Sequence, residues 1–145
     1  MKKLFVFFIG VLFLTSCTKD NESITYFNFI NTTNSDLKII APRTDAGHSI
    51  VLDSVTVINQ GAEAEFFYVE DGENQTSKYP FGKSLIKASI VFNDSVRIDY
   101  FYNDTSSRNI LIIDNYAGGK VSESTFRYTY TITEEDYNNA LLIGY

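Results

Sequence analysis

The chain has 145 residues, with 12 basic and 18 acidic side chains, one histidine, one cysteine and no tryptophan. This length suits one domain with a single modest core, and the acidic balance argues against nucleic acid, whose binding depends on neutralisation of phosphates by Lys and Arg. The same balance argues against attachment to an anionic membrane surface by charge, and a single cysteine cannot form an intramolecular disulfide.

The first sixteen residues have the pattern of a secretory signal peptide. Lys2 and Lys3 precede an apolar run of eleven residues, Leu4 to Leu14, whereas a membrane-spanning helix needs about 20. The run ends in Leu-Thr-Ser-Cys at positions 14–17, which resembles the lipobox of bacterial lipoproteins. The resemblance implies a lipoprotein signal peptide over residues 1–16 and a lipid on the thiol of Cys17. The alternatives are a buried free cysteine or half of a disulfide, but no second cysteine is present.

Residues 17–23 are expected to be the lipidated cysteine and a short polar tether. Lys19-Asp20 resembles the export signal of Bacteroidetes lipoproteins, although Asn21 interrupts the acidic run before Glu22. This resemblance implies the outer face of the outer membrane. A simple solvated linker and the periplasmic face are the alternatives. Because each buried methylene contributes about 0.8 kcal/mol, several acyl chains hold a protein at a membrane essentially permanently.

The remaining segment, residues 24–145, is rich in strand formers. Removal of residues 1–16 leaves 129 residues that keep all ten Tyr and eight of the twelve Phe, with ten basic and 18 acidic side chains and a net charge near −8. Short runs of β-branched and aromatic residues alternate with turn residues, which is typical of an all-β sandwich or barrel. The predicted strands are residues 24–30, 37–41, 50–58, 64–69, 84–92, 95–102, 109–114 and 125–133.

Turn signals separate these strands. Pro42 is expected to end the second strand, and Asn93-Asp94 predicts a tight hairpin because both residues tolerate positive φ. Residues 117–120, Ala-Gly-Gly-Lys, are predicted as a turn. Alternation predicts two sets of inward side chains, Val96, Ile98, Tyr100 and Tyr102 in one strand and Phe126, Tyr128, Tyr130 and Ile132 in another.

The last segment changes from strand to helix character. Thr133 and Asp136 have the spacing of a capping box, and the acidic first turn suits the helix dipole. One short helix is therefore predicted within residues 134–142, with Tyr137, Ala140 and Leu141 packed on a sheet. Seven or eight strands and this helix favour a two-sheet antiparallel sandwich, with a small β-barrel as the alternative because periodicity does not report closure.

Two segments carry a further resemblance. The stretches ASIVFNDSVRIDYFY (88–102) and YTYTITEEDYNNA (128–140), together with the lipobox, resemble small Bacteroidetes lipoproteins that end in a Tyr/Thr-rich strand followed by a Thr-Glu-Glu-Asp-Tyr helix start. The function of that group is uncharacterised, so the resemblance implies a location and no catalytic residue.

Few side chains are available for catalysis or metal binding. His48 is the single histidine, and lipidation of Cys17 leaves no thiol, so Cys–His nucleophiles and Cys/His zinc sites are excluded. Some pair of carboxylates is inevitable among 18 acids and identifies no glycosidase. Residues 70–74, Glu-Asp-Gly-Glu-Asn, gather oxygen ligands without EF-hand spacing. We therefore expect no enzyme activity, no cofactor and no metal site.

Two kinds of candidate site remain. Asp53-Ser54-Val55 and Asp94-Ser95-Val96 resemble the Bacteroidetes O-glycosylation motif, with Ser95 and Ser54 as acceptors, although both tripeptides also fit ordinary strand entries. The long connection 73–83 carries Tyr79, Phe81 and Lys83, a set typical of a ligand-binding loop. The simpler alternative is that the two aromatic rings plug one end of the sandwich.

The sequence thus predicts a lipid-anchored outer-membrane protein with one β-sandwich domain that acts as a non-catalytic binding or interaction module. A glycan or a protein is the expected ligand, and nucleic acid is not. An inhibitor or immunity-type protective lipoprotein that binds a protein partner is the alternative function.

Overall fold

The computed structural model describes residues 22–44, 50–71, 79–81, 85 and 87–143. Its strands form a four-stranded sheet in the order β4-β1-β8-β7, here sheet A, and a five-stranded sheet in the order β3-β2-β5-β6-β9, here sheet B. The elements are β1 (Glu22–Asn31), β2 (Leu37–Thr44), β3 (Ile50–Ile58), β4 (Glu63–Asp71), β5 (Lys87–Phe92), β6 (Val96–Phe101), η1 (Ile113–Asn115), β7 (Ala117–Ser122), β8 (Thr125–Ile132), α1 (Glu134–Asn138) and β9 (Leu141–Leu142).

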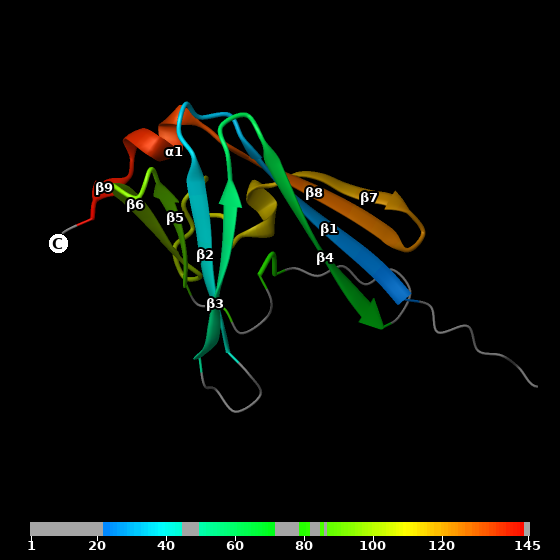
Figure 1. Cartoon of the computed structure of the whole chain (residues 1–145). Coiled ribbons are helices and arrows are strands. Elements are labelled where there is room, and N and C mark those ends of the chain that lie inside the picture. Colours follow the sequence, from blue (N-terminus) through cyan, green and yellow to red (C-terminus); the bar gives the residue numbers. More distant parts are fainter. Residues whose placement is uncertain (1–21, 45–49, 72–78, 82–84, 86, 144–145) are drawn as a thin grey trace, which may run out of the picture.

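The two sheets enclose one hydrophobic core, with sheet A at the right and sheet B at the left of Figure 1. The predicted all-β sandwich with a short C-terminal helix is therefore confirmed. The alternative of a small closed barrel is wrong, because the two sheets share no strand. Neighbouring strands are antiparallel with one exception, since β1 and β8 run parallel from the Ile24–Thr125 pair to the Asn31–Ile132 pair.

Alternation along β1 places aromatic rings in the centre of the core. Phe27 and Phe29 are fully buried, while the alternate residues Tyr26, Asn28 and Ile30 are half-buried on the other face of sheet A. The Phe27 ring stacks on Tyr128 with centroids 5.7 Å apart and meets Tyr116 edge-on at 5.8 Å. Burial of these rings and of the aliphatic side chains around them is the main force that holds the two sheets together.

The strand bounds follow the predicted bounds closely in the first half of the chain. β3 has the predicted range, but β1 begins two residues early at Glu22, so the tether 17–23 loses its last two residues to the sheet. β2 continues through Pro42 to Thr44, beyond its predicted end. The pairing of β2 with β5 ends at Ile40–Ser89, so the missing N–H of Pro42 interrupts no hydrogen bond on that side.

The strand predicted over residues 109–114 is wrong. This segment is a series of turns that ends in the 3₁₀ helix η1, and its neighbours Ile110 and Leu111 are both buried instead of alternating. Asn109 and Asn115 donate side-chain hydrogen bonds to loop carbonyls, which gives the backbone partners that a strand would otherwise need. The apolar side chains of this segment therefore pack into the core, although its backbone forms a loop.

The turn predicted over residues 117–120 is also wrong, because these residues form the first part of β7, paired with β8. Glycine is a poor strand former, and the strand exists because β8 offers a complete edge beside it. The chain reverses later, at Glu123 and Ser124.

The hairpin after β5 is confirmed, since Asn93 and Asp94 adopt φ values of 47° and 55°. The capping box of Thr133 and Asp136 is confirmed, but α1 ends at Asn138 and β9 replaces the rest of the predicted helix. Tyr137 meets the Phe92 ring at 5.4 Å as expected. The predicted burial of Leu141 is wrong, because its side chain is 76% exposed.

Candidate functional site

An open groove of about 620 Å³ lies beside the edge of sheet A. Its lining comes from three parts of the chain, namely the end of β6, the loop that leads into β7, and the β7–β8 hairpin. We call it the tyrosine groove, lined by Tyr102, Leu111, Ile112, Ile113, Asp114, Tyr116, Gly118 and Tyr128. Its volume lies within the ~300–1,000 Å³ common for small-molecule sites.

Asn109 organises the loop that forms one wall of the groove. This side chain is fully buried, and its amide nitrogen donates to the carbonyl of Phe101 at 2.7 Å. Its oxygen accepts from the N–H of Leu111 at 2.9 Å. A buried side chain with both ends satisfied holds the loop in one conformation and so fixes the groove wall.

Tyr116 anchors the same loop to the core. Its hydroxyl donates to the carbonyl of Ile110 at 2.6 Å, and its ring lies 5.2 Å from the ring of Tyr130. Burial raises the pKa of Tyr116 well above the ordinary phenol value, so this group stays a hydrogen-bond donor over the whole physiological range. Tyr116 therefore forms part of the groove floor and has no hydrogen free for a ligand.

Gly118 keeps β7 close to β8 at the groove. Its φ of +119° favours glycine, and a Cβ built there would overlap the carbonyl oxygen of Arg127 and lie 3.3 Å from Tyr128 Cα. No side chain can therefore grow from this position, and the backbone of β7 is left accessible from the groove.

Two polar groups in the lining are available to a ligand. The ring of Tyr128 is held by stacking on Phe27, but its hydroxyl makes no hydrogen bond with any described residue. Asp114 is exposed and likewise forms no hydrogen bond or ion pair within the described part of the chain. One donor–acceptor hydroxyl and one charged acceptor thus face the same open space.

Tyr79, which was predicted as part of a binding loop, lies at the margin of the groove. Its ring is 5.8 Å from that of Tyr102. A hydrogen bond with Tyr79, together with burial, raises the pKa of Tyr102. Tyr102 was predicted to point into the core, but it follows the end of β6 and is 45% exposed. The pair therefore adds a partly exposed aromatic surface beside the groove.

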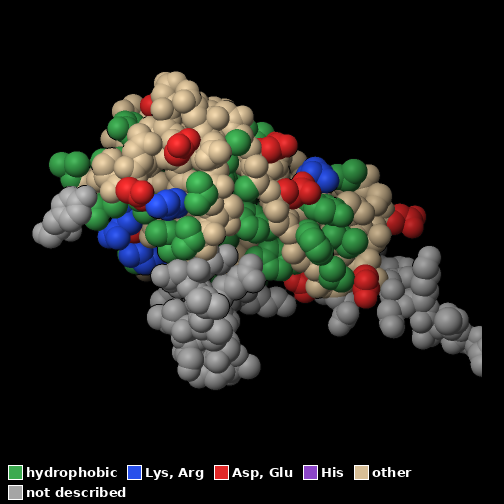
Figure 2. All heavy atoms as spheres, in the orientation of Figure 1, with side chains coloured by type: hydrophobic (Ala, Val, Ile, Leu, Met, Phe, Trp, Pro, Cys, Tyr) green, Lys and Arg blue, Asp and Glu red, His purple; other side chains and the backbone are tan. Residues whose placement is uncertain are grey.

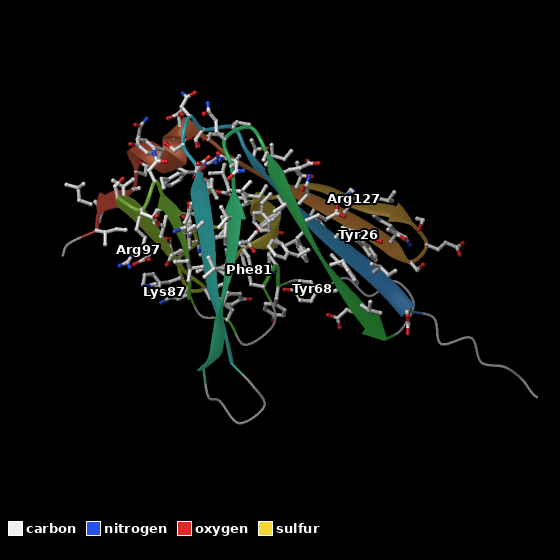
Figure 3. All side chains as sticks on the ribbon, in the orientation of Figure 1. Tyr26, Tyr68, Phe81, Lys87, Arg97 and Arg127 are labelled. Atoms are coloured by element: carbon white, nitrogen blue, oxygen red, sulfur yellow. The ribbon has the colours of Figure 1, made fainter. Side chains whose placement is uncertain are left out.

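The other residues predicted for the binding loop are not at the groove. Phe81 is buried and stacks on Phe29 with centroids 5.3 Å apart, so it plugs the core as the simpler alternative proposed. In Figure 3, Phe81 and Tyr68 both point between the sheets. Lys83 lies outside the described residues.

The remaining candidates have the following positions. Ser95 is exposed in the hairpin connection between β5 and β6, where an acceptor for O-glycosylation would be accessible. Ser54 lies within β3, opposite Ala41 of β2. Cys17 and His48 lie outside the described residues, so their predicted roles stay predictions.

A buried ion pair lies outside the groove. Arg108 donates to both carboxylate oxygens of Asp136, whose side chain is 1% exposed, and its guanidinium lies 5.4 Å from the centre of the Tyr130 ring. The hydrogen bond to Asp136 raises the pKa of Arg108. Burial raises the pKa of Tyr100 and of Tyr130 beside it. Every charge here is paired within the fold, which indicates a structural role.

Sequence reasoning missed most of the groove. Asp114 and Ile112 were placed in a strand and Gly118 in a turn, so neither wall was expected. One usable signal was present, since Asn109 and Asn115 flank the apolar run and such residues favour loops stabilised by side-chain hydrogen bonds.

No helix in the described ranges is long and apolar enough to cross a membrane. Over the same residues, no group of three His, Cys, Asp or Glu side chains is placed to hold a metal ion. Comparisons of the chain with protein-family models, curated proteins and solved structures gave no match.

Proposed function

We propose that the protein is a lipid-anchored, non-catalytic binding protein of the bacterial outer membrane, and that the tyrosine groove binds a glycan. The lipobox with Cys17 supports the anchor, and the likeness of Lys19-Asp20 to the export signal of Bacteroidetes lipoproteins supports the outward-facing side. The sandwich then begins only five residues after the lipid, which allows a separation of about 18 Å at full extension.

The single observation that carries the ligand class is the combination of aromatic rings with two unused polar groups in the tyrosine groove. Sugars present apolar C–H faces and many hydroxyl groups. Tyr102 offers an exposed ring for such a face, while Tyr128 and Asp114 offer a hydroxyl and a carboxylate for sugar hydroxyls. The tyrosine groove is open, so it can hold one part of a longer glycan chain.

A binding role without catalysis fits the side chains of the groove. Among the described lining residues Asp114 is the one carboxylate, whereas glycoside hydrolysis normally uses two carboxyl groups about 5 to 10 Å apart. Tyr116 and Gly118 supply packing and backbone rather than groups that exchange protons. The groove therefore supports retention of a glycan at the cell surface.

The ligand proposal is tested with the full-length lipidated chain in detergent and a panel of immobilised bacterial and host polysaccharides. We expect saturable binding to a defined subset. Tyr128→Phe should weaken binding about fivefold by loss of one hydrogen bond, and Asp114→Asn by about 10- to 100-fold by loss of a charged acceptor. Tyr26→Phe on the outer face of sheet A is the matched control and should leave binding unchanged.

Failure to bind any polysaccharide, or equal effects of Tyr128→Phe and Tyr26→Phe, would reject the glycan proposal. The location is tested separately by proteinase added to intact cells, beside a Cys17→Ala variant. Cleavage on intact cells and loss of the variant from the membrane fraction are expected. Protection until the outer membrane is broken would instead place the protein on the periplasmic face.

A further inference from the structure

The outer face of sheet B differs in charge from the rest of the chain. Among the described ion pairs of this face, three cations, Lys38, Lys87 and Arg97, share two carboxylates, Asp94 and Asp99. This local excess of positive charge contrasts with a net charge near −8 for residues 17–145. In Figure 2 the Lys and Arg side chains gather at the left, over β5 and β6, beside hydrophobic atoms.

Arg97 has hydrogen-bonding capacity that the fold does not use. Its Nε pairs with Asp99 Oδ1 at 3.1 Å, but its two terminal nitrogens form no hydrogen bond with a described residue. Asp99 is already shared, because it also accepts from Ser89 at 2.6 Å and pairs with Lys87 at 3.0 Å. The free end of a guanidinium is the group that binds a carboxylate through two parallel hydrogen bonds.

A groove of about 540 Å³ with a mixed polar and apolar lining includes this arginine, and we call it the β6 groove; Asp99 and Asn139 are its other polar residues. Ile98 and Phe101 of β6 form one side, and Leu142 and Ile143 form the other. The side chains of Leu141 and Leu142 are 76% and 82% exposed. Two adjacent exposed leucines beside an exposed arginine form a small apolar surface of the kind found at protein interaction sites.

The sheet edge beside the β6 groove is incomplete. β9 pairs with β6 only at Val96–Leu142 and Arg97–Leu141. On that side, Ile98 to Phe101 have no neighbouring strand among the described residues, although β6 continues to Phe101. An added strand that continued the line of β9 would find main-chain groups of β6 to pair with. The carbonyl of Phe101 is the exception, because it already accepts from the Asp104 N–H and the Asn109 side chain.

The outer face of sheet A differs in how its arginine is used. Arg127 lies over the Tyr26 ring, 4.7 Å from its centre, and also pairs with Glu65, so its charge is neutralised within the fold. Figure 3 shows Tyr26 and Arg127 together on that face, well separated from Lys87 and Arg97. Arg127 on sheet A can therefore serve as the control for Arg97 on sheet B in the same molecule.

From these observations we propose that the β6 groove binds an extended segment of a partner protein that carries a carboxylate and, at an alternate position on the same face, an apolar side chain. The segment adds as a strand beside Ile98–Phe101, its carboxylate takes the terminal nitrogens of Arg97, and its apolar side chain packs on Phe101, which lies on the same face of β6 as Arg97. This surface is separate from the tyrosine groove. It would serve the inhibitor or immunity-type role that is the alternative function of this protein.

The test selects short random peptides displayed on phage against the full-length lipidated chain in detergent. We expect the selected peptides to share an acidic residue and, at alternate positions, apolar residues. Synthetic copies should bind Arg97→Gln about 10- to 100-fold more weakly and should lose binding when alternate backbone nitrogens are methylated. Arg127→Gln on sheet A is the control and should bind as the parent chain does.

Phe101→Ser is a second variant on the same face of β6 as Arg97, at a side chain that is 46% exposed, and it should weaken peptide binding about fivefold to tenfold. Absence of selected peptides, or peptides that bind Arg97→Gln and the parent chain equally, overturns the proposal. Binding that survives backbone methylation overturns strand addition. Because Arg97 lies outside the tyrosine groove, glycan binding should be the same in Arg97→Gln and the parent chain, which separates this result from the function proposed above.

Discussion

Asp136 links the C-terminal helix to the body of the sandwich. Its carboxylate accepts from Arg108 through both oxygens and from the backbone N–H of Thr133 at 2.9 Å, and the Tyr100 hydroxyl lies 3.4 Å away. The same side chain therefore completes the capping box of α1 and neutralises a cation that is largely withdrawn from water. Asp136 therefore contributes more to the stability of the fold than its position in a five-residue helix indicates.

We predict that Asp136→Asn lowers the free energy of unfolding by about 3 kcal/mol, because it leaves Arg108 without its partner in a poorly solvated place. Urea unfolding followed by circular dichroism measures the change. Glu135→Gln, an exposed neighbour in the same helical turn, is the control and should alter stability by less than about 0.5 kcal/mol. Equal effects of the two variants would show that the ion pair contributes nothing.

For individual residues, the sequence predicted contacts between positions close together in the chain and missed contacts between distant positions. The spacing of Thr133 and Asp136 identifies a capping box because both partners lie in one helical turn. The pairing of Asp136 with Arg108 joins residues 28 positions apart, and no local pattern specifies it. For the same reason the approach of Tyr79 to Tyr102 could not be read from the sequence.

At the scale of elements, β7 is the strand that depends most on its neighbour. Ala117, Gly118 and Gly119 have little strand propensity, and the backbone of Gly118 approaches the carbonyl of Arg127 so closely that a Cβ would collide with it. β7 also forms one border of the tyrosine groove. A shift of β7 would therefore change both the edge of sheet A and the shape of the tyrosine groove.

We predict that Gly118→Ala destabilises the fold by about 3 kcal/mol and weakens glycan binding, because the added methyl group separates β7 from β8. Gly119→Ala is the matched control. Its φ of +151° is also unfavourable for alanine, but a Cβ there meets nothing within 4 Å, so we expect a loss of about 1 kcal/mol. Thermal unfolding of the two variants compares the collision with the backbone strain alone, and equal losses would contradict the prediction.

The elements that the sequence predicted well are those with alternation and bounded turns, such as β3 and β8. The errors concern segments whose local conformational preference differs from the structure that their tertiary contacts favour. Residues 109–114 have strand composition but form a loop, since Asn109 and Asn115 satisfy its backbone. Residues 117–120 have turn composition but form a strand, since β8 presents an edge. Both errors lie around the tyrosine groove, so that site could not be predicted.

At the scale of the whole molecule, three tyrosines of the core make stability depend on pH. Burial raises the pKa values of Tyr100, Tyr116 and Tyr130 above the ordinary phenol value of 10.0. An acid whose pKa is raised by folding holds its proton more tightly in the folded state. The stabilisation is therefore fully present below the unfolded pKa and is lost as the pH rises toward the folded values.

We predict that the free energy of unfolding changes little between about pH 6 and pH 10 and falls steeply above that range. A spectrophotometric titration should show that part of the ten tyrosines ionises gradually, while the buried ones ionise in one cooperative step that coincides with unfolding. Tyr116→Phe should reduce the amplitude of that step. A single gradual titration of all tyrosines with the near-ultraviolet circular dichroism intact would contradict this.

The parallel pairing of β1 with β8 has a consequence for how the protein matures. β1 is the first strand of the domain, yet one of its two neighbours in sheet A lies about a hundred residues later, at Thr125 to Ile132. Until β8 is present, β4 is the strand that pairs with β1, and Phe29 has no Tyr130 to pack against. Contacts of such long range make folding slow and expose aromatic surface while the chain waits. Folding of the domain is thus tied to completion of the chain, because a chain cut before β8 lacks the strand that joins β1 to β7 in sheet A.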